Sequence, residues 1–313
     1  RFVLNVYSSS SEDSPLPIYD YEDFINMQQG QYYILLNDIV LPNADNESTG
    51  VTRFTPLTGN FASLDGNGHT VIFSGTYDMG SLSSIGVFSS LALDSQIKNL
   101  NVRFAFASNG SDMNDSETDD GYQLGGLRTV KFITTASSFS FAGLVVQNNG
   151  IITNCHVQTE SNYTSELYIA VIADNASTGS YVTGFVAQNS GYITNSSVRV
   201  NIKSPFRIGG FVGTNTGKIA ACYFREGKII NNSNQNQYAA GFAYSNGENG
   251  QIITSYVSGM TSSSSLYSLD RNSYVSANER GAGFIYQNLG YISDCYTDIY
   301  LAVTPNMAGF VYA

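Results

Sequence analysis

Apolar and polar positions recur along this chain in one pattern, exemplified by the stretch GGFVGTNTGKIAACYF from Gly209 to Phe224. A related copy starts at each of six further positions, the first being degenerate and the last short: Ile85, Ala142, Thr183, Ala240, Ala282 and Ala308. Each copy reads as a short apolar run, a turn of the Asn-x-Gly kind, and a second apolar run. A repeat this short cannot bury its own apolar face, so it must stack on its neighbours. The pattern therefore predicts a solenoid of short strands.

The copies keep one register, counted from an anchoring glycine: Gly143, Gly184, Gly210, Gly241, Gly283 and Gly309. Five residues later stands an asparagine: Asn148, Asn189, Asn215, Asn246 and Asn288. Then comes a turn glycine, for which we expect positive φ, followed by an isoleucine: Ile152, Ile193, Ile219, Ile252 and Ile292. Parallel stacking places identical residues about 4.8 Å apart. We therefore predict a row of stacked asparagines and a row of stacked Phe or Leu residues.

The predicted fold is all-β, a right-handed parallel β-helix with a short N-terminal capping helix and inserted loops. Residues 1–29 form a lead-in and N-terminal cap, with a helix expected from Asp20 to Met27 and ended by Gly30. Residues 30–313 form the parallel β-helix. Because the last copy stops within its first strand, we expect the helix either to continue beyond the C-terminus or to dock another subunit.

The pattern G-G-[FL]-V-x-x-N-x-G-x-I-x-x-[CS] resembles the GLUG-type repeats of large bacterial surface proteins, including the non-catalytic region of IgA-peptidase-like proteins. The upstream stretches YEDFINMQQGQYYILLNDIVL and FASLDGNGHTVIF resemble the opening coils of pectate-lyase-like β-helices. At the fifth position, where that family often has glycine, this chain keeps only Gly213 and has Val146, Ala187, Tyr244 and Tyr286 in the other copies. The resemblance implies the β-helix fold and a surface or adhesin location.

Composition narrows the classes of partner. Apolar residues make up 42% of the chain and charged residues only 12%, with 14 basic residues against 25 acidic ones and a net charge of −11. This balance disfavours nucleic acid and anionic membrane surfaces as partners. The sequence has no apolar run of the length that spans a bilayer, so we expect no transmembrane segment.

The chemistry-bearing residues do not form a catalytic pattern, and we expect no enzyme, metal or cofactor. His69 lies in the segment DGNGHT, which reads as a turn followed by a strand, and this position is typical of a structural residue. Cys155 and His156 are adjacent, so on a strand their side chains point to opposite faces and cannot form a nucleophile–base pair. Cys155, Cys222 and Cys295 share one offset with serines between them, which predicts free thiols too far apart for disulfides.

Two surface features stay open. The acidic loop from Ser108 to Gly121 carries several calcium-type ligands but lacks the EF-hand glycine, so we expect a solvated loop rather than a calcium site. Asn-x-Ser/Thr sequons, the acceptor motif of N-glycosylation, are frequent because the chain is rich in Asn, Ser and Thr. Their number alone is therefore no evidence of glycosylation. Those considered as glycan acceptors are Asn46, Asn109, Asn114, Asn162 and Asn231, of which the last two fall in predicted loops.

One outward row holds His156 and Ser197 and then three tyrosines, Tyr223, Tyr256 and Tyr296. This row predicts a surface-contact ladder for sugars or a neighbouring subunit, with ordinary solvated β-formers as the alternative. We expect an extracellular or cell-surface structural or adhesive protein that works as a stalk, adhesin segment or filament subunit, by stacking and contact rather than catalysis. The alternatives are a glycan-binding module and a polysaccharide lyase or hydrolase with carboxylates on its loops. The expected partners are a second copy of the chain, the continuation of a longer chain, or glycans.

Overall fold

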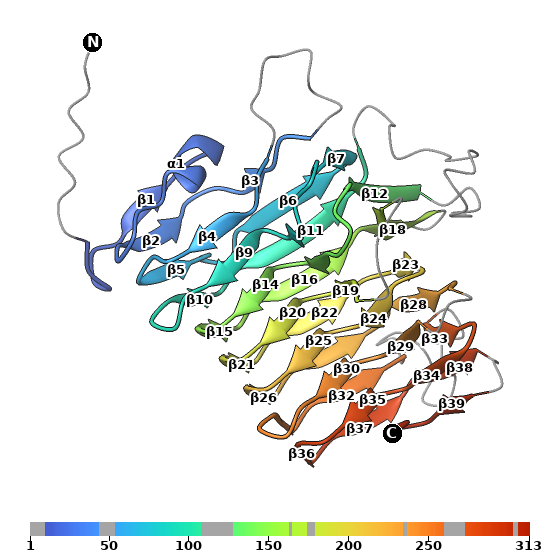
Figure 1. Cartoon of the computed structure of the whole chain (residues 1–313). Helices are drawn as coiled ribbons and strands as arrows, with labels where there is room; N and C mark the ends of the chain where they lie inside the picture. Colours follow the sequence, from blue (N-terminus) through green and yellow to red (C-terminus); the bar gives the residue numbers. More distant parts are fainter. Residues whose placement is uncertain are drawn as a thin grey trace, which may run out of the picture.

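The computed structural model describes residues 10–43, 54–107, 128–162, 165–173, 179–233, 237–259, 273–302 and 306–313. In these segments the chain winds as a β-helix whose strands line up in five sheets, and one short helix lies at one end of the stack (Figure 1). Strands of successive coils pair in parallel, and β17 against β18 is the antiparallel pair among the described strands. The predicted all-β parallel solenoid is confirmed, and its right-handed sense stays a prediction.

The first sheet contains, in stacking order, β1 (Leu16–Ile18), β2 (Tyr32–Leu35), β5 (Ser63–Asp65), β10 (Gln96–Lys98), β15 (Ile151–Thr153), β21 (Tyr192–Thr194), β26 (Lys218–Ala220), β31 (Gln251–Ile253) and β36 (Tyr291–Ser293). The second sheet contains β3 (Ile39–Val40), β6 (Thr70–Ser74), β11 (Asn101–Ala105), β16 (His156–Thr159), β22 (Ser197–Arg199), β27 (Tyr223–Arg225), β32 (Tyr256–Ser258) and β37 (Tyr296–Asp298). The third sheet contains β7 (Thr76–Asp78), β12 (Arg128–Ile133), β18 (Ser165–Ile172), β23 (Ile202–Ser204), β28 (Lys228–Asn231), β33 (Tyr274–Ala277) and β38 (Tyr300–Ala302), with β17 (Ser161–Asn162) beside β18.

The fourth sheet contains β8 (Ser84–Ile85), β13 (Ser140–Ala142), β19 (Tyr181–Thr183), β24 (Arg207–Gly209), β29 (Tyr238–Ala240), β34 (Arg280–Ala282) and β39 (Met307–Ala308). The fifth sheet contains β4 (Leu57–Gly59), β9 (Phe88–Leu91), β14 (Val145–Asn148), β20 (Val186–Asn189), β25 (Val212–Asn215), β30 (Ala243–Asn246) and β35 (Ile285–Asn288). One coil therefore runs from the fifth sheet through the first, second, third and fourth sheets before the next coil begins.

The core is built from the rows that the repeat predicts. Phe185, Phe211, Phe242 and Phe284 are fully buried, and their ring centroids lie 4.7 to 4.9 Å apart from coil to coil. The isoleucine row pairs Ile152 with Ile193 and continues in the same register to Ile292. The predicted row of stacked Phe residues is confirmed, and the isoleucines form a further row beside it.

The asparagine row is also confirmed, and it is a chain of hydrogen bonds through the interior. Each Nδ2 donates to Oδ1 of the asparagine in the next coil, at distances from 2.7 to 2.8 Å, along Asn148, Asn189, Asn215, Asn246 and Asn288. Oδ1 of Asn148 also accepts from the backbone N–H of Gly150, two residues on. The row thereby satisfies buried polar groups while it sets the register of the coils.

The reason expected for the turn glycines is wrong. None of Gly150, Gly191 and Gly217 has positive φ, and a Cβ on Gly191 would lie 2.1 Å from the carbonyl oxygen of Gly150 in the adjacent coil. These glycines are required because two coils approach each other closely at that turn. Left-handed backbone falls instead four residues later in the repeat, at Asn154 with φ of 53° and at its counterparts.

The N-terminal helix is shorter than expected. Helix α1 spans Tyr21–Ile25, with Asp20 as N-cap accepting from the backbone N–H of Asp23, and Asn26 as C-cap. The predicted extension to Met27 and end at Gly30 are wrong, since Gly30 lies in the turn before β2. Phe24 of α1 is buried against Phe88 at a centroid distance of 6.0 Å, so the helix covers the end of the core.

Strand β1 lies within the predicted lead-in and already pairs with β2. No helix in the described part of the chain is long and apolar enough to cross a membrane.

Candidate functional site

The outward face of the second sheet carries one continuous row of side chains along the solenoid axis. Strand pairing places these residues in adjacent coils: Asn101, His156, Ser197, Tyr223, Tyr256 and Tyr296. At about 4.8 Å per coil the row is about 24 Å long. We call its aromatic half, made of Tyr223, Tyr256 and Tyr296, the tyrosine face.

The tyrosines of this face form a nearly parallel stack. The rings of Tyr223 and Tyr256 lie 4.9 Å apart at 7°, and those of Tyr256 and Tyr296 lie 4.9 Å apart at 6°. The first two side chains are half-buried, and Tyr296 is 52% exposed. The stack is therefore an ordered and partly exposed aromatic surface, of the kind that would lose little conformational entropy on contact with a ligand.

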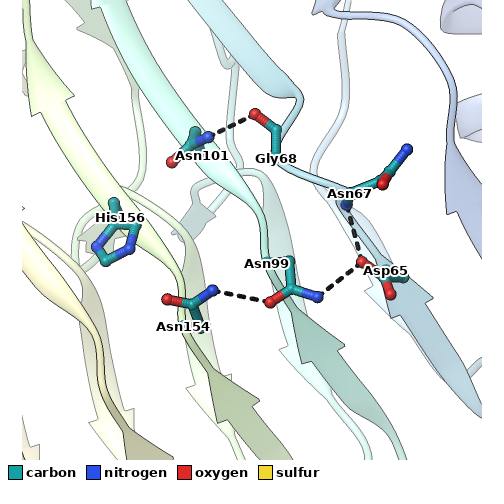
Figure 2. A pocket seen from close by; sticks show the side chains of 7 residues that line it. All are labelled: Asp65, Asn67, Gly68, Asn99, Asn101, Asn154 and His156. Carbon is teal, nitrogen blue, oxygen red and sulfur yellow. Dashed lines mark hydrogen bonds between the residues drawn. The ribbon is translucent and has the colours of Figure 1, made fainter.

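A polar pocket of about 370 Å³ lies at the other half of the row, where the first sheet turns into the second. Figure 2 shows its lining, which consists of Asp65, Asn67, Gly68, Asn99, Asn101, Asn154 and His156. An amide relay crosses it: Nδ2 of Asn154 donates to Oδ1 of Asn99 at 2.8 Å, and Nδ2 of Asn99 donates to Oδ1 of Asp65 at 3.0 Å (Figure 2).

Left-handed backbone explains why asparagines gather in this corner. Asn67, Asn99 and Asn154 have φ values of 51°, 55° and 53°, a conformation that asparagine tolerates better than most residues. In the following coils the same corner holds Asn195, Ala221, Thr254 and Asp294, all with positive φ. From Asn99 onward the corner has one positive-φ residue in each coil, and side-chain identity decides where a polar pocket forms.

His156 joins the pocket to the tyrosine face. Its Nδ1 lies 2.7 Å from the hydroxyl oxygen of Ser197 in the next coil. Burial, together with the positive charge of Arg225, lowers the pKa of His156. The imidazole is therefore neutral at pH 7, with one ring nitrogen engaged by a hydroxyl group.

Charges beside the tyrosines are few and partly compensated. The guanidinium of Arg225 lies over the ring of Tyr223 at 5.4 Å from the centroid. Nε of Arg199 forms an ion pair with Glu226 at 3.2 Å. The face therefore offers aromatic and hydrogen-bonding groups more than net charge.

The two predicted glycan acceptors that the structure describes, Asn162 and Asn231, are not part of this face. Asn46, Asn109 and Asn114 lie outside the described residues, as does the acidic loop from Ser108 to Gly121. The expected loop positions of Asn162 and Asn231 are wrong, since these residues belong to β17 and β28. The Asn231 side chain is 1% exposed, with Nδ2 donating to Phe206 O and Oδ1 accepting from Ser233 N, so the folded chain does not present its amide for modification. Glycosylation of the other acceptors stays a prediction.

Cys155 and His156 do point apart, as expected. The Cys155 thiol is fully buried and donates to Thr153 O, and burial raises its pKa to about 12. Cys222 is likewise buried, Cys295 is half-buried, and all three are free thiols. His69 lies 3.3 Å from Asp38, an exposed contact that joins neighbouring coils.

Within the described segments, no three His, Cys, Asp or Glu side chains gather as a group able to hold a metal ion. Asp65 is the single carboxylate among the residues that line the pocket, and Lys98 lies 3.8 Å from it.

Sequence reasoning missed the pocket. The repeat shows no acidic row at the position of Asn154 and Asp294, so nothing there predicts a catalytic site. The signal that identifies the corner is the recurrence of Asn at one offset after the isoleucine, in a position that turns out to need positive φ. That Asp65 and Asn67 complete the pocket follows only from the folding of the non-repetitive first coils.

Comparisons with known proteins assign no family to this chain. No family model matches the chain, so the GLUG-type assignment stays a prediction, and no curated protein matches it either. Among solved structures, the crystal structure of a putative immunoglobulin A1 protease from Bacteroides ovatus is similar, with a TM-score of 0.45, 15% identity, and coverage of 96% of this chain and 85% of that chain. The β-helix class rests on this chain's own strand register, because a similarity at that level carries no argument.

Proposed function

We propose that this chain is a rigid adhesive segment of an extracellular or cell-surface protein, and that its tyrosine face and the adjoining polar pocket contact a glycan. The observation that supports this proposal most directly is the stack of Tyr223, Tyr256 and Tyr296, which three consecutive coils hold in register. The proposed unit comprises residues 30–313, with residues 1–29 as lead-in and cap.

The chemistry of the row suits an uncharged sugar chain. The parallel stack largely covers the ring faces of its inner members, so it offers a sugar chain a line of ring edges and, at Tyr296, a more exposed ring. The amides of Asn99, Asn101 and Asn154 provide donors and acceptors in the adjoining pocket. A chain of sugars aligned with the solenoid axis would contact both halves of the row at once.

The same site supports a non-catalytic role. Glycoside hydrolysis uses a pair of carboxylic acids on either side of the scissile bond. The pocket lining supplies one carboxylate, Asp65, which accepts hydrogen bonds from Asn99 and from the backbone of Asn67. We therefore propose binding without turnover.

Binding to immobilised neutral oligosaccharides tests the proposal. The double variant Tyr223→Ala/Tyr256→Ala should lose affinity for the selected glycan by about tenfold, since each aromatic contact contributes about 0.5 to 1.5 kcal/mol. The matched control is Tyr192→Ala, which removes the same side chain from the outward side of the first sheet and should bind as the unmodified protein does. Equal affinity of all three proteins, or no binding to any neutral glycan, would contradict the proposal.

Two further experiments test the absence of glycan cleavage and the location of the protein at the cell surface. Incubation with the bound polysaccharide should release no new reducing ends and no unsaturated products, and release of either would establish an enzyme instead. Antibodies against the chain should label intact cells of the source organism if the protein is exposed at the surface.

A second proposal concerns the last described coil, which presents apolar surface. Ile292, Cys295 and Phe310 are half-buried, whereas Ile252, one coil before Ile292, and Phe284, one coil before Phe310, are fully buried. We propose that this surface is covered by a second copy or by further coils of a longer chain. Negative-stain electron microscopy of the protein isolated from its source should show filaments or longer rods, whereas rods of this chain's length alone would contradict both forms of cover.

A further inference from the structure

A second outward row, on the fourth sheet, alternates tyrosine and arginine. Tyr181 pairs with Arg207 in the next coil. Two coils beyond Tyr181 lies Tyr238, which pairs with Arg280 in the coil after it. The register of β24 and β29 places Arg207 next to Tyr238, so the four residues occupy four consecutive coils.

Three tyrosines at the outward position of the fifth sheet and at the chain's last turn complete this surface. The ring of Tyr286 stacks on those of Tyr238, Tyr244 and Tyr312, with centroids 4.6, 5.3 and 5.2 Å apart. We call the set the arginine–tyrosine face: Tyr181, Arg207, Tyr238, Tyr244, Arg280, Tyr286 and Tyr312.

Both guanidinium groups are held by aromatic rings. The guanidinium of Arg207 lies 5.4 Å from the ring centroid of Tyr181 and 5.3 Å from that of Tyr244, and its NH1 donates to the Tyr181 hydroxyl at 3.0 Å. Arg280 lies 5.5 Å from the ring of Tyr238 and donates a hydrogen bond to Tyr286. Stacking fixes the planes of both groups and leaves other N–H donors unused.

No carboxylate in the described part of the chain forms an ion pair with either arginine. Nε of Arg207 is buried and has no hydrogen-bond partner among the described residues. Since the whole chain carries 25 acidic and 14 basic residues, two uncompensated guanidinium groups on one face are a marked local excess of positive charge. Such an excess attracts an anion.

We propose that the arginine–tyrosine face binds a carboxylated polysaccharide, a ligand class distinct from the neutral glycan proposed for the tyrosine face. Arg207 and Arg280 are two coils apart, about 10 Å, so they suit carboxylates that recur along an extended polymer. Each guanidinium donates two parallel N–H groups to one carboxylate. Tyr238, between them, has Tyr286 and the Arg280 guanidinium against its ring, so it offers the intervening sugar the edge of that ring.

The aromatic content of the face favours a polysaccharide over an acidic peptide. Five tyrosine rings surround two arginines, whereas binding a polyanion by charge alone needs cations and no rings. The site lies on the fourth and fifth sheets and shares no residue with the tyrosine face on the second sheet. The two proposals can therefore fail independently.

Binding of polygalacturonate to the full chain, measured by isothermal titration calorimetry at low salt, tests the proposal. The unmodified protein should bind, and Arg207→Gln/Arg280→Gln should reduce affinity at least about tenfold, because charge-assisted hydrogen bonds are the stronger kind. Arg280→Gln alone, at an exposed side chain, should give a smaller loss without affecting folding. The matched control is Lys218→Gln, which removes one positive charge that lies over the ring of Tyr192 on the first sheet and should leave affinity unchanged.

Other ligands separate the sources of affinity. Fully methyl-esterified polygalacturonate, which lacks the charge, should bind at least about tenfold more weakly, and poly-glutamate, which lacks the sugar rings, should do the same. Equal affinity for poly-glutamate, an equal loss in Lys218→Gln, or full binding by the double arginine variant would each overturn the proposal. Retained binding of the neutral glycan by the double variant shows that the tyrosine face is intact, so a loss of polygalacturonate binding is then specific to the arginines.

Discussion

A buried asparagine in this protein is tolerated because its neighbours above and below are also asparagines. Asn215 is fully buried, and its amide accepts from Asn189 and donates to Asn246. One residue type serves as donor to one coil and acceptor from the other, so the row is satisfied throughout its middle. A break in the row leaves two partners unpaired rather than one.

We therefore expect Asn215→Ala to lower the free energy of unfolding by about 2 to 4 kcal/mol, since each buried group left without a partner costs about 1 to 3 kcal/mol. Urea unfolding followed by circular dichroism measures the change. The control is Gln188→Ala on the neighbouring strand, whose exposed side chain points outward and should cost less than about 0.5 kcal/mol. A similar cost for both variants would show that the asparagine row does not stabilise the fold.

Cysteines and serines alternate at one inward position of the repeat. This alternation suggests that a serine can replace a cysteine there with little change in packing. The Cys222 thiol donates to Ala220 O, and the Ser196 hydroxyl one coil away donates to Thr194 O in the same way. Burial raises the pKa of Cys222 to about 12, so the thiol stays neutral in the folded chain when it would ionise in the unfolded chain.

The sign of the pH effect follows from this shift. The neutral thiol's contribution to stability is complete below pH 9 and falls as the pH rises toward 12, by up to about 1.4 kcal/mol per pH unit. Cys222→Ser should match the unmodified protein within about 1 kcal/mol at pH 7 and become relatively more stable above pH 9. Urea unfolding of both proteins at pH 7, 9 and 11 under reducing conditions measures the difference, and parallel curves would contradict it.

At the scale of the element, stacked coils depend on the absence of side chains at fixed points. A Cβ on Gly210 would lie 2.0 Å from the carbonyl oxygen of Gly241 in the next coil, and Gly184 meets Gly210 in the same way at 2.1 Å. These are contacts between backbones, which no side-chain rearrangement relieves. The anchoring glycines thus set the spacing at which the strands of the fourth and fifth sheets pair.

Gly210→Ala should therefore lower the free energy of unfolding by at least about 2 kcal/mol. The same substitution at Gly309 is the matched control, because a Cβ there has no atom within 4 Å, and it should change stability by less than about 0.5 kcal/mol. Thermal unfolding of the two variants measures both effects. Equal melting temperatures would show that the coils can separate enough to accept a methyl group.

At the scale of the whole molecule, each coil contacts mainly the coils on either side, so local stability follows local burial. Ile193 and Ile219 are fully buried in β21 and β26, whereas Ile292 in β36 is half-buried. We expect backbone amides of β36 and β37 to exchange hydrogen at least about tenfold faster than those of β21 and β26. Hydrogen–deuterium exchange by mass spectrometry measures this gradient, and uniform protection would indicate that the solenoid unfolds as one unit.

The solenoid also turns short repeats into long rows of side chains on each face. A tyrosine at one offset contributes a single ring, and stacking converts three such residues into an ordered surface on the second sheet. The same geometry on the fourth sheet brings Arg207 and Arg280 into one line with the tyrosines. Each coil adds one position to every face, which is how a chain without a catalytic pattern presents two chemically different surfaces.

Much of this architecture follows from the sequence alone. The spacing from Gly184 to Asn189 and Ile193 recurs in each copy, and it determines the strands, the parallel register and the buried rows, because a fixed repeat can bury its apolar side only by stacking on itself. The tyrosine row and the free thiols follow by the same counting. The location of Asn231 and the end of α1 do not, since loop length and helix caps depend on contacts outside the repeat.

Only the tertiary structure decided how the faces are composed. The polar pocket needs Asp65 from the irregular early coils beside Asn99 and Asn154. The recurring Asn is only a weak signal of left-handed backbone at that corner, because other copies have Ala, Thr or Asp at the same position. Tyr244 and Tyr286 read as departures from a glycine position, yet they pack around Arg207 and Arg280 from another sheet. The repeat specifies contacts between equivalent positions, whereas these sites join different positions across a corner, and the path of the folded backbone brings them together.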